Sequence, residues 1–200
     1  MEIPSRSDLE VVERQLGRVP LADVAGIVAR CARGAPRVVV AHPLVKEARR
    51  QTDEAGGGWA LVRPFPTVFW LTCPRVTCAV SGLESEGMIG EIRQRLQKDA
   101  SLREAVERAN ARYAESRAAL LTAEDVRTLE GAPAGMLEAV TSSGVGGIAD
   151  PRGVKCLHMH VADYLAGNPN PIGEMVVQRL AERGTALDCD VPDGECWAGR

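Results

Sequence analysis

Residues 59–74 read Trp-Ala-Leu-Val-Arg-Pro-Phe-Pro-Thr-Val-Phe-Trp-Leu-Thr-Cys-Pro, and this stretch does most to decide the fold class. Up to Thr72 it is dominated by β-branched and aromatic residues, which suit the pleated surface of a sheet. Pro64 and Pro66 interrupt it, because proline has no N–H to donate to a neighbouring strand. The stretch therefore predicts two short strands, or one bent edge strand, that end at Cys73.

Helical patterns fill most of the remaining chain around a second short strand at 37–41. The run Ser7-Asp8-Leu9-Glu10 has the form of a capping box and predicts a helix that ends at Gly17. A similar run, 101–104, predicts another helix start. The spacing of apolar residues predicts further helices over 21–32, 74–121, 154–165 and 172–182. Few strands and many helices indicate a helix-rich α+β fold, with a small sheet of short strands covered by several helices.

The length and charge of the chain indicate one domain with an acidic end. A chain of 200 residues with 45% apolar residues fits a single globular domain, which we place at 1–186. Segment 187–200 carries four acidic residues against Arg200, so it accounts for the whole net charge of −3. Its composition and terminal position favour a disordered tail. The balanced remainder offers no broad basic field for nucleic acid or an anionic membrane.

The sequence also carries signals about location. No apolar run approaches the roughly 20 residues of a membrane span, and the charged N-terminal stretch lacks the apolar centre of a signal peptide. We therefore expect a cytoplasmic protein. In that compartment the six cysteines are expected to be thiols or metal ligands, because cytosolic disulfides are rare.

The run Lys155-Cys156-Leu157-His158-Met159-His160 gathers three good metal ligands within five residues. On a helix, Cys156 and His160 would share a face while His158 pointed away. All three reach one centre only if Cys156 lies in the loop or the first turn. Cys73, at the end of the best strand, and Cys31 are the further candidates, with zinc as the expected metal and an iron–sulfur cluster as the alternative.

Each candidate has a purely structural alternative. Free cysteines often pack in cores, which is the preferred interpretation for Cys78 and an equal one for Cys31. His158 and His160 could instead be satisfied polar groups in the core, and His42 a surface or capping residue. Cys189 and Cys196 are spaced more widely than the cysteines of zinc ribbons, although either could donate a fourth ligand.

A glycine-rich segment precedes the cysteine–histidine run. Gly146 and Gly147 offer backbone N–H groups, and Arg152, Lys155 and Asn170 follow, so the segment could hold an anion. It matches neither the Walker loop nor the dinucleotide fingerprint. A plain flexible connection explains it equally well.

Several uncommon runs resemble a bacterial, mainly actinobacterial, family known as domain of unknown function 501. The runs are 65–74, Leu83-Glu84, 154–158 and 170–173, together with Arg30-Cys31, Gly34 and Pro36, and the resemblance covers most of residues 8–185. It implies a loose association with cell division or polyphosphate metabolism, because family members are encoded near a septum-formation initiator and an exopolyphosphatase-like protein. It implies no known activity and no established catalytic residues.

Three functions fit these observations. The first is metal binding through the cysteine–histidine cluster, structural with four protein ligands and catalytic with three ligands and a water. The second is a metal-free enzyme in which a histidine activates a cysteine toward a phosphate-containing or other anionic small molecule. The third is a non-enzymatic protein linked to cell division that docks a partner through its Arg/Glu-rich helices at 91–117. We prefer the first.

Overall fold

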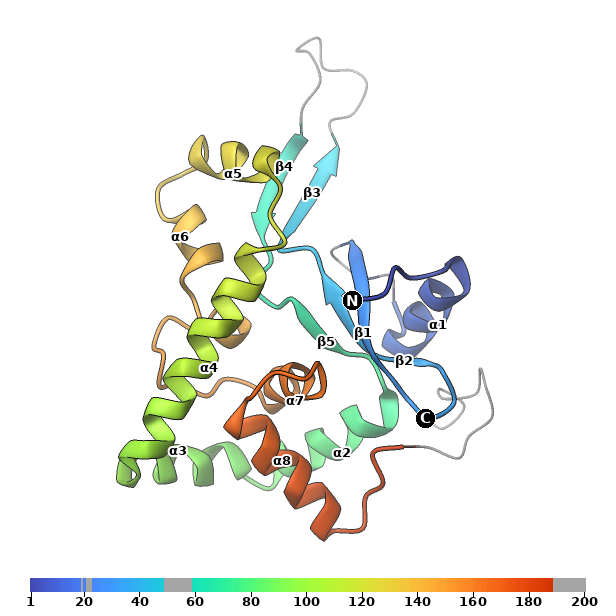
Figure 1. The fold of residues 1–200 in the computed structure, drawn as a ribbon, viewed down its shortest axis with the longest axis vertical. Helices are drawn as coiled ribbons and strands as arrows, with labels where there is room; N and C mark the ends of the chain where they lie inside the picture. Colours follow the sequence, from blue (N-terminus) through green and yellow to red (C-terminus); the bar gives the residue numbers. More distant parts are fainter. Residues whose placement is uncertain (19, 21–22, 49–58, 189–200) are drawn as a thin grey trace.

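The computed structural model describes residues 1–18, 20, 23–48 and 59–188 (Figure 1). The strands within this part of the chain are β1 (Val24–Arg30), β2 (Pro36–Ala41), β3 (Leu44–Ala48), β4 (Trp59–Pro64) and β5 (Phe69–Leu71). The helices are α1 (Arg6–Leu16), α2 (Pro74–Ser85), α3 (Met88–Lys98), α4 (Ala100–Ala118), α5 (Ala123–Glu130), α6 (Met136–Thr141), α7 (Leu157–Leu165) and α8 (Pro171–Glu182), with a short 3₁₀ turn, η1 (Val145–Gly147).

The central sheet is small and antiparallel, with strand order β1-β2-β5. All six residues of β2 are buried, as expected for a middle strand that is covered on both faces. β3 and β4 pair separately as a two-stranded antiparallel ribbon. These short strands among many helices confirm the predicted α+β class, and the proline-interrupted stretch forms the two strands β4 and β5.

Each face of β2 packs against a different helix layer, because successive side chains of a strand point to opposite faces. Val38 and Val40 lie in one hydrophobic cluster with Tyr113 of α4 and Ala162 of α7. Val39 lies in another cluster with Val12 of α1. The sheet is therefore enclosed between α1 on one side and α4 with α7 on the other (Figure 1).

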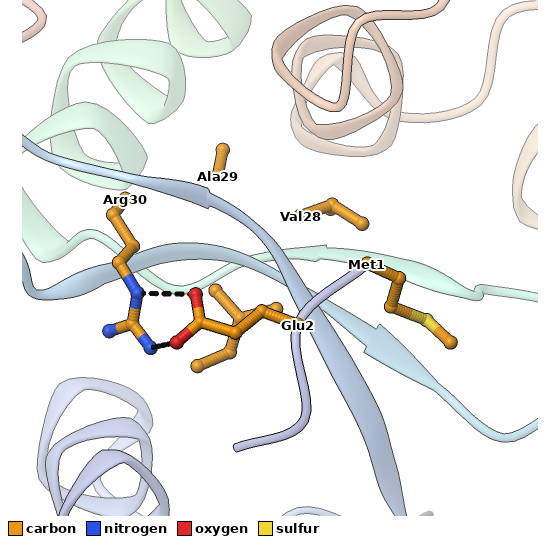
Figure 2. Close-up of a pocket in the computed structure, with 6 residues that line it drawn as sticks. Met1, Glu2, Val28, Ala29 and Arg30 are labelled. Atoms are coloured by element: carbon orange, nitrogen blue, oxygen red, sulfur yellow. Dashed lines mark hydrogen bonds and ion pairs between the residues drawn. The ribbon is translucent and has the colours of Figure 1, made fainter. Parts of the chain in front are cut away.

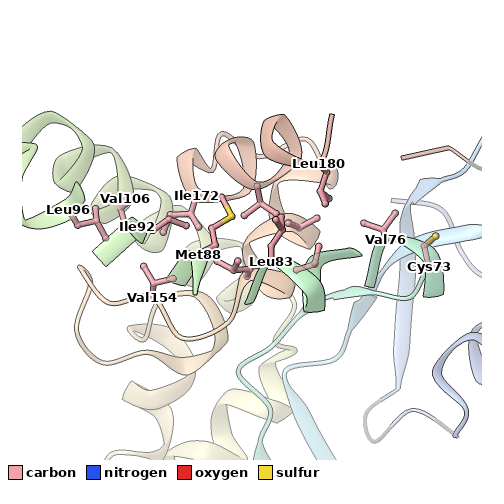
Figure 3. Close-up of a cluster of buried hydrophobic side chains, with 14 residues drawn as sticks. Cys73, Val76, Leu83, Met88, Ile92, Leu96, Val106, Val154, Ile172 and Leu180 are labelled. Carbon is pink, nitrogen blue, oxygen red and sulfur yellow. The ribbon is translucent and has the colours of Figure 1, made fainter. Parts of the chain in front are cut away.

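A second, larger core lies among the helices α2, α3, α4, α7 and α8 (Figure 3). Its buried members include Val76, Leu83, Ile92 and Leu157. Leu71 of β5 packs against both this core and the cluster of Val38. The helical layer and the sheet thus share one continuous apolar interior.

The start of the chain pairs with the outer edge of β1. Glu2 forms an isolated antiparallel bridge with Ile27, and its carboxylate pairs with the guanidinium of Arg30 at 2.7 and 3.0 Å (Figure 2). Arg30 also pairs with Asp8 of α1 at 2.7 Å. These contacts lower the pKa of both carboxyl groups below their usual range.

The expected helix over 21–32 is wrong, because this segment contains strand β1. Ile27 and Val28 are β-branched, and the pairing of β1 with β2 satisfies its backbone groups. The N-cap of α1 is Ser5, in a capping box with Asp8, rather than Ser7. Likewise Asp99, whose carboxylate accepts from Leu102 N–H, caps α4 in place of Ser101.

Two further boundaries matter for the site. The helix expected from Val154 begins at Leu157, which leaves Cys156 as its N-cap residue in an extended conformation. The segment 123–141, for which the sequence predicted no helix, holds α5 and α6. Within the described residues, no helix has both the length and the apolar character needed to cross a membrane.

Candidate metal centre

The N-terminal end of α7 meets one face of α2. α7 contributes His158 and its N-cap residue Cys156. α2 contributes Thr77, Ser81 and Glu84, whose spacing of four and three residues places them on the same side of a helix. Because Cys156 precedes the first helical turn, its side chain can approach His158 rather than His160.

Three potential ligand atoms converge there. Cys156 Sγ lies 3.4 Å from His158 Nδ1, and Glu84 Oε1 lies 3.3 Å from the same nitrogen. The three ligand atoms all fall within 4.8 Å of one another, and each residue is half-buried. A thiol, an imidazole and a carboxylate in this arrangement could hold a metal ion.

The other ring nitrogen of His158 fixes the tautomer. Nε2 lies 3.1 Å from the backbone oxygen of Thr77 and 3.1 Å from Ser81 Oγ. A carbonyl oxygen can only accept, so Nε2 carries the proton and donates it to Thr77. In the neutral ring, Nδ1 then presents its lone pair to Cys156 and Glu84, which is the arrangement of a metal-ligating histidine with an outer hydrogen bond.

The two ligand distances to His158 Nδ1 match zinc geometry. With ordinary zinc–ligand bond lengths and tetrahedral angles, a thiolate sulfur and an imidazole nitrogen lie about 3.6 Å apart, and a nitrogen and a carboxylate oxygen about 3.3 Å. The corresponding distances here are 3.4 and 3.3 Å. Both distances to His158 Nδ1 are therefore compatible with one shared ion, while the sulfur and the carboxylate oxygen are within 4.8 Å of each other.

Glu84 also has a structural role. Its Oε1 accepts a hydrogen bond of 2.6 Å from Leu157 N–H, one of the free donors at the start of α7. The hydrogen bond that the protonated ring can donate from Nδ1 to Cys156 Sγ is the main influence that raises the pKa of His158, against the lowering effect of burial. The negative charge of Glu84 also raises it.

The remaining predicted ligands lie elsewhere. Cys73 is 5% exposed and lies in the hydrophobic cluster around Val76 (Figure 3). Cys31 is buried directly after β1 rather than on a helix face. His160 is buried, its Nδ1 lies 3.2 Å from the side-chain amide nitrogen of Asn170, and burial lowers its pKa to about 4. The structure brings together Cys156 and His158, but none of these three joins them in the ligand group.

Three amides of the glycine-rich segment donate within the protein. Gly144 N–H donates to Ile148 O, Val145 N–H to Asn110 Oδ1 and Gly147 N–H to Gly144 O. Gly146 has φ +65°, and a Cβ there would lie 2.3 Å from Met159 Sδ, so close packing explains this glycine.

The other proposed anion ligands are dispersed. Arg152 pairs with Glu107 at 2.8 Å, and Lys155 is exposed. Asn170 is 1% exposed and caps α8, where its Oδ1 accepts from Gly173 N–H at 3.0 Å. Its side chain is therefore engaged within the core.

Four cysteine and histidine residues remain. Two of them have a different exposure from the one expected, and two lie outside the described residues. Cys78 is exposed on α2 rather than packed in the core. His42 is partly buried, with Nε2 3.3 Å from the carboxylate of Asp125. Cys189 and Cys196 lie beyond the described residues.

Glu84 was absent from the predicted ligands. The tight cysteine–histidine run is the strongest ligand pattern in the sequence, whereas Glu84 lies more than seventy positions away from it in the chain. The available signal was the uncommon run Leu83-Glu84, which contributes to the family resemblance. No neighbouring residue in the sequence indicates a partner for its carboxylate. Only the docking of α2 against α7 reveals its role.

Comparison with known families supports that resemblance. A family model described as "Protein of unknown function (DUF501)" matches residues 27–178, which is more than half of the chain. The chain belongs to this family. The DUF501 match includes Glu84, Cys156 and His158. No curated protein and no solved structure matches the chain.

Proposed function

We propose that this protein binds a transition-metal ion, zinc by preference, through Glu84, Cys156 and His158. The observation that carries the proposal is the convergence of the three ligand atoms while Thr77 occupies the far nitrogen of His158. Zinc accepts sulfur, nitrogen and oxygen ligands in one tetrahedral shell. An iron–sulfur cluster would ordinarily need several cysteine thiolates, and this group contains one.

Three protein ligands suit a reactive site better than a purely structural one. Structural zinc sites are closed by four protein ligands, whereas catalytic sites leave a position for water or substrate. A bound water would have a lowered pKa and could act as a nucleophile or be replaced by a substrate oxygen. The Ser81 hydroxyl, 3.1 Å from His158 Nε2, belongs to the outer shell that orients the imidazole.

A second candidate is a metal-free thiol enzyme, favoured by the 3.4 Å contact between Cys156 and His158. In catalytic triads, however, the acidic residue orients the imidazole through the nitrogen opposite to the nucleophile. Here Glu84 and Cys156 approach the same nitrogen. That geometry fits coordination of one ion better than a relay of protons.

The test is metal content after purification without chelator or metal-affinity resin. We expect about one equivalent of zinc per wild-type chain, and its loss from Cys156→Ser and from Glu84→Gln. Cys73→Ser is the matched control, because Cys73 is also a free cysteine but lies in the core cluster. Circular dichroism verifies that each variant is folded.

Two results would oppose the proposal. If the wild-type protein is purified without metal and also fails to take up added zinc, metal binding is rejected and the thiol enzyme remains as the candidate. If the Cys73→Ser variant loses its zinc and the Cys156→Ser variant still holds about one equivalent, the metal lies at a different site.

A further inference from the structure

A buried arginine lies at the other end of α2, away from the metal centre. Arg37 of β2 is 9% exposed, and its Nε is buried without a hydrogen-bond partner among the described residues. The neighbouring turn between β1 and β2 directs the N–H of Ala32 toward the same place, and Arg75 comes from the first turn of α2. We refer to Arg37, Arg75 and the Ala32 N–H as the Arg37 cluster.

One carboxylate occupies this cluster. Asp188 Oδ1 forms an ion pair with the guanidinium of Arg37 and accepts from Ala32 N–H at 3.1 Å. The backbone oxygen of Asp188 lies 3.5 Å from Arg75 Nη1. The chain after α8 thus returns to the sheet beside the start of α2 (Figure 1). The carboxylate is held here by one buried cation and a backbone amide. The second cation, Arg75, contacts the backbone oxygen of the same residue and so lies beside the carboxylate.

The beginning of α2 adds to the positive potential. The side chain of its N-cap residue, Cys73, makes no capping hydrogen bond, and the first turn contains no acidic residue. The free N–H groups of a helix start favour an anion, and Arg75 increases the positive charge there. The buried guanidinium of Arg37 also needs a counter-charge because burial removes its water.

Asp188 differs from the cluster that holds it in exposure and in its position relative to the family match. The side chain of Asp188 is 59% exposed, whereas that of Arg37 is 10% exposed. Arg37, Arg75 and Ala32 lie within the segment that the family model matches, and Asp188 lies beyond its end. The cluster therefore belongs to the family region, and the carboxylate that fills it comes from the following acidic segment.

We propose that the Arg37 cluster is a binding site for a small oxyanion-bearing ligand, and that Asp188 is a displaceable intramolecular substitute for it. Guanidinium groups and backbone N–H groups bind carboxylate and phosphate by the same hydrogen bonds. The tethered carboxylate competes with any external anion at a high local concentration. This site is independent of the proposed metal.

The test uses the full chain and follows the Ala32 amide by ¹H–¹⁵N NMR during titration with inorganic phosphate, and separately with acetate, at constant ionic strength. We expect a saturable shift in Asp188→Ala at a concentration several-fold lower than in the wild type. Saturation by phosphate alone assigns a phosphate-bearing ligand, and saturation by acetate assigns a carboxylate.

Arg75→Gln in the Asp188→Ala background is the control, because Arg75 is exposed and its loss leaves the core intact. This double variant should bind the anion several-fold more weakly. If the Ala32 amide of Asp188→Ala shows no saturable shift with either anion, or a shift that Arg75→Gln leaves unchanged, the proposal is overturned.

Discussion

Arg117 and Asp125 are charged residues whose side chains are completely buried. Arg117 donates to backbone oxygens around the glycine-rich segment and to Pro66 O, and burial lowers its pKa. Asp125 accepts from the backbone N–H and the hydroxyl of Thr122, both at 2.8 Å, and forms an ion pair with Lys46. In both cases multiple polar partners replace the lost water, as a buried charge requires.

The carboxylate of Asp125 should make stability depend on pH in the acid range. Burial alone would raise its pKa, but the hydrogen bonds from Lys46 and Thr122 outweigh burial and lower it to about 2. The unfolded chain, with a carboxyl pKa near ~4, binds a proton first as the pH falls. Asp125 therefore contributes stability above pH ~4, and about 2 kcal/mol is lost as the pH falls from there to about 2.

Urea unfolding of the wild type and Asp125→Asn at several pH values measures this effect. The amide cannot titrate, so the stability difference between the two proteins should narrow by about 2 kcal/mol between pH 5 and pH 2. A difference that stays constant over this range would show that Asp125 is not held in its charged form.

At the scale of elements, local sequence signals located α1, β2, β5 and α8 because each has clear periodicity or a clear boundary residue. They failed over 21–32, where apolar spacing fits a helix but pairing with β2 forms the strand β1. The candidate ligands Cys156 and His158 were recognisable because they lie two positions apart in the sequence. Glu84 was not, because its approach depends on how α2 docks against α7, which is a tertiary property.

The contact between α7 and α8 depends on a glycine. A Cβ at Gly173 of α8 would lie 2.2 Å from the His160 backbone oxygen and 2.5 Å from Tyr164 Cβ. Neither atom can move without displacing α7, so Gly173→Ala should reduce the free energy of unfolding by about 3 kcal/mol.

Gly82→Ala is the matched control for this prediction. Gly82 lies within α2, and no atom lies within 4 Å of the Cβ position there. Alanine is a better helix former, so this variant should gain about 0.5–1 kcal/mol. Denaturant unfolding measures both changes, and equal effects from the two substitutions would contradict close packing of α7 on α8.

At the scale of the whole molecule, the sheet and the helical layer are joined by shared apolar side chains. Leu71 of β5 and Leu165 of α7 each pack against both the helical core and the cluster around Val38. The metal candidates Cys156 and His158 lie at the start of α7, the helix that spans this junction. The centre is therefore held by the same packing that holds the two layers together.

This shared core predicts one cooperative unfolding transition, in agreement with the single domain expected from the sequence. Far-ultraviolet circular dichroism follows mainly the helices, and tryptophan fluorescence includes Trp70 of the sheet. The two signals should give the same denaturant midpoint in metal-free protein. Separate midpoints would indicate that the sheet and the helical layer unfold independently.

The most direct test of the metal centre is zinc-edge X-ray absorption of the wild type loaded with one equivalent of zinc. Coordination by Glu84, Cys156 and His158 predicts one sulfur neighbour at about 2.3 Å, with the remaining nitrogen and oxygen neighbours at about 2.0–2.2 Å. Three or four sulfur neighbours would require other cysteines as ligands. A spectrum without sulfur would exclude Cys156, and either result would contradict the proposed centre.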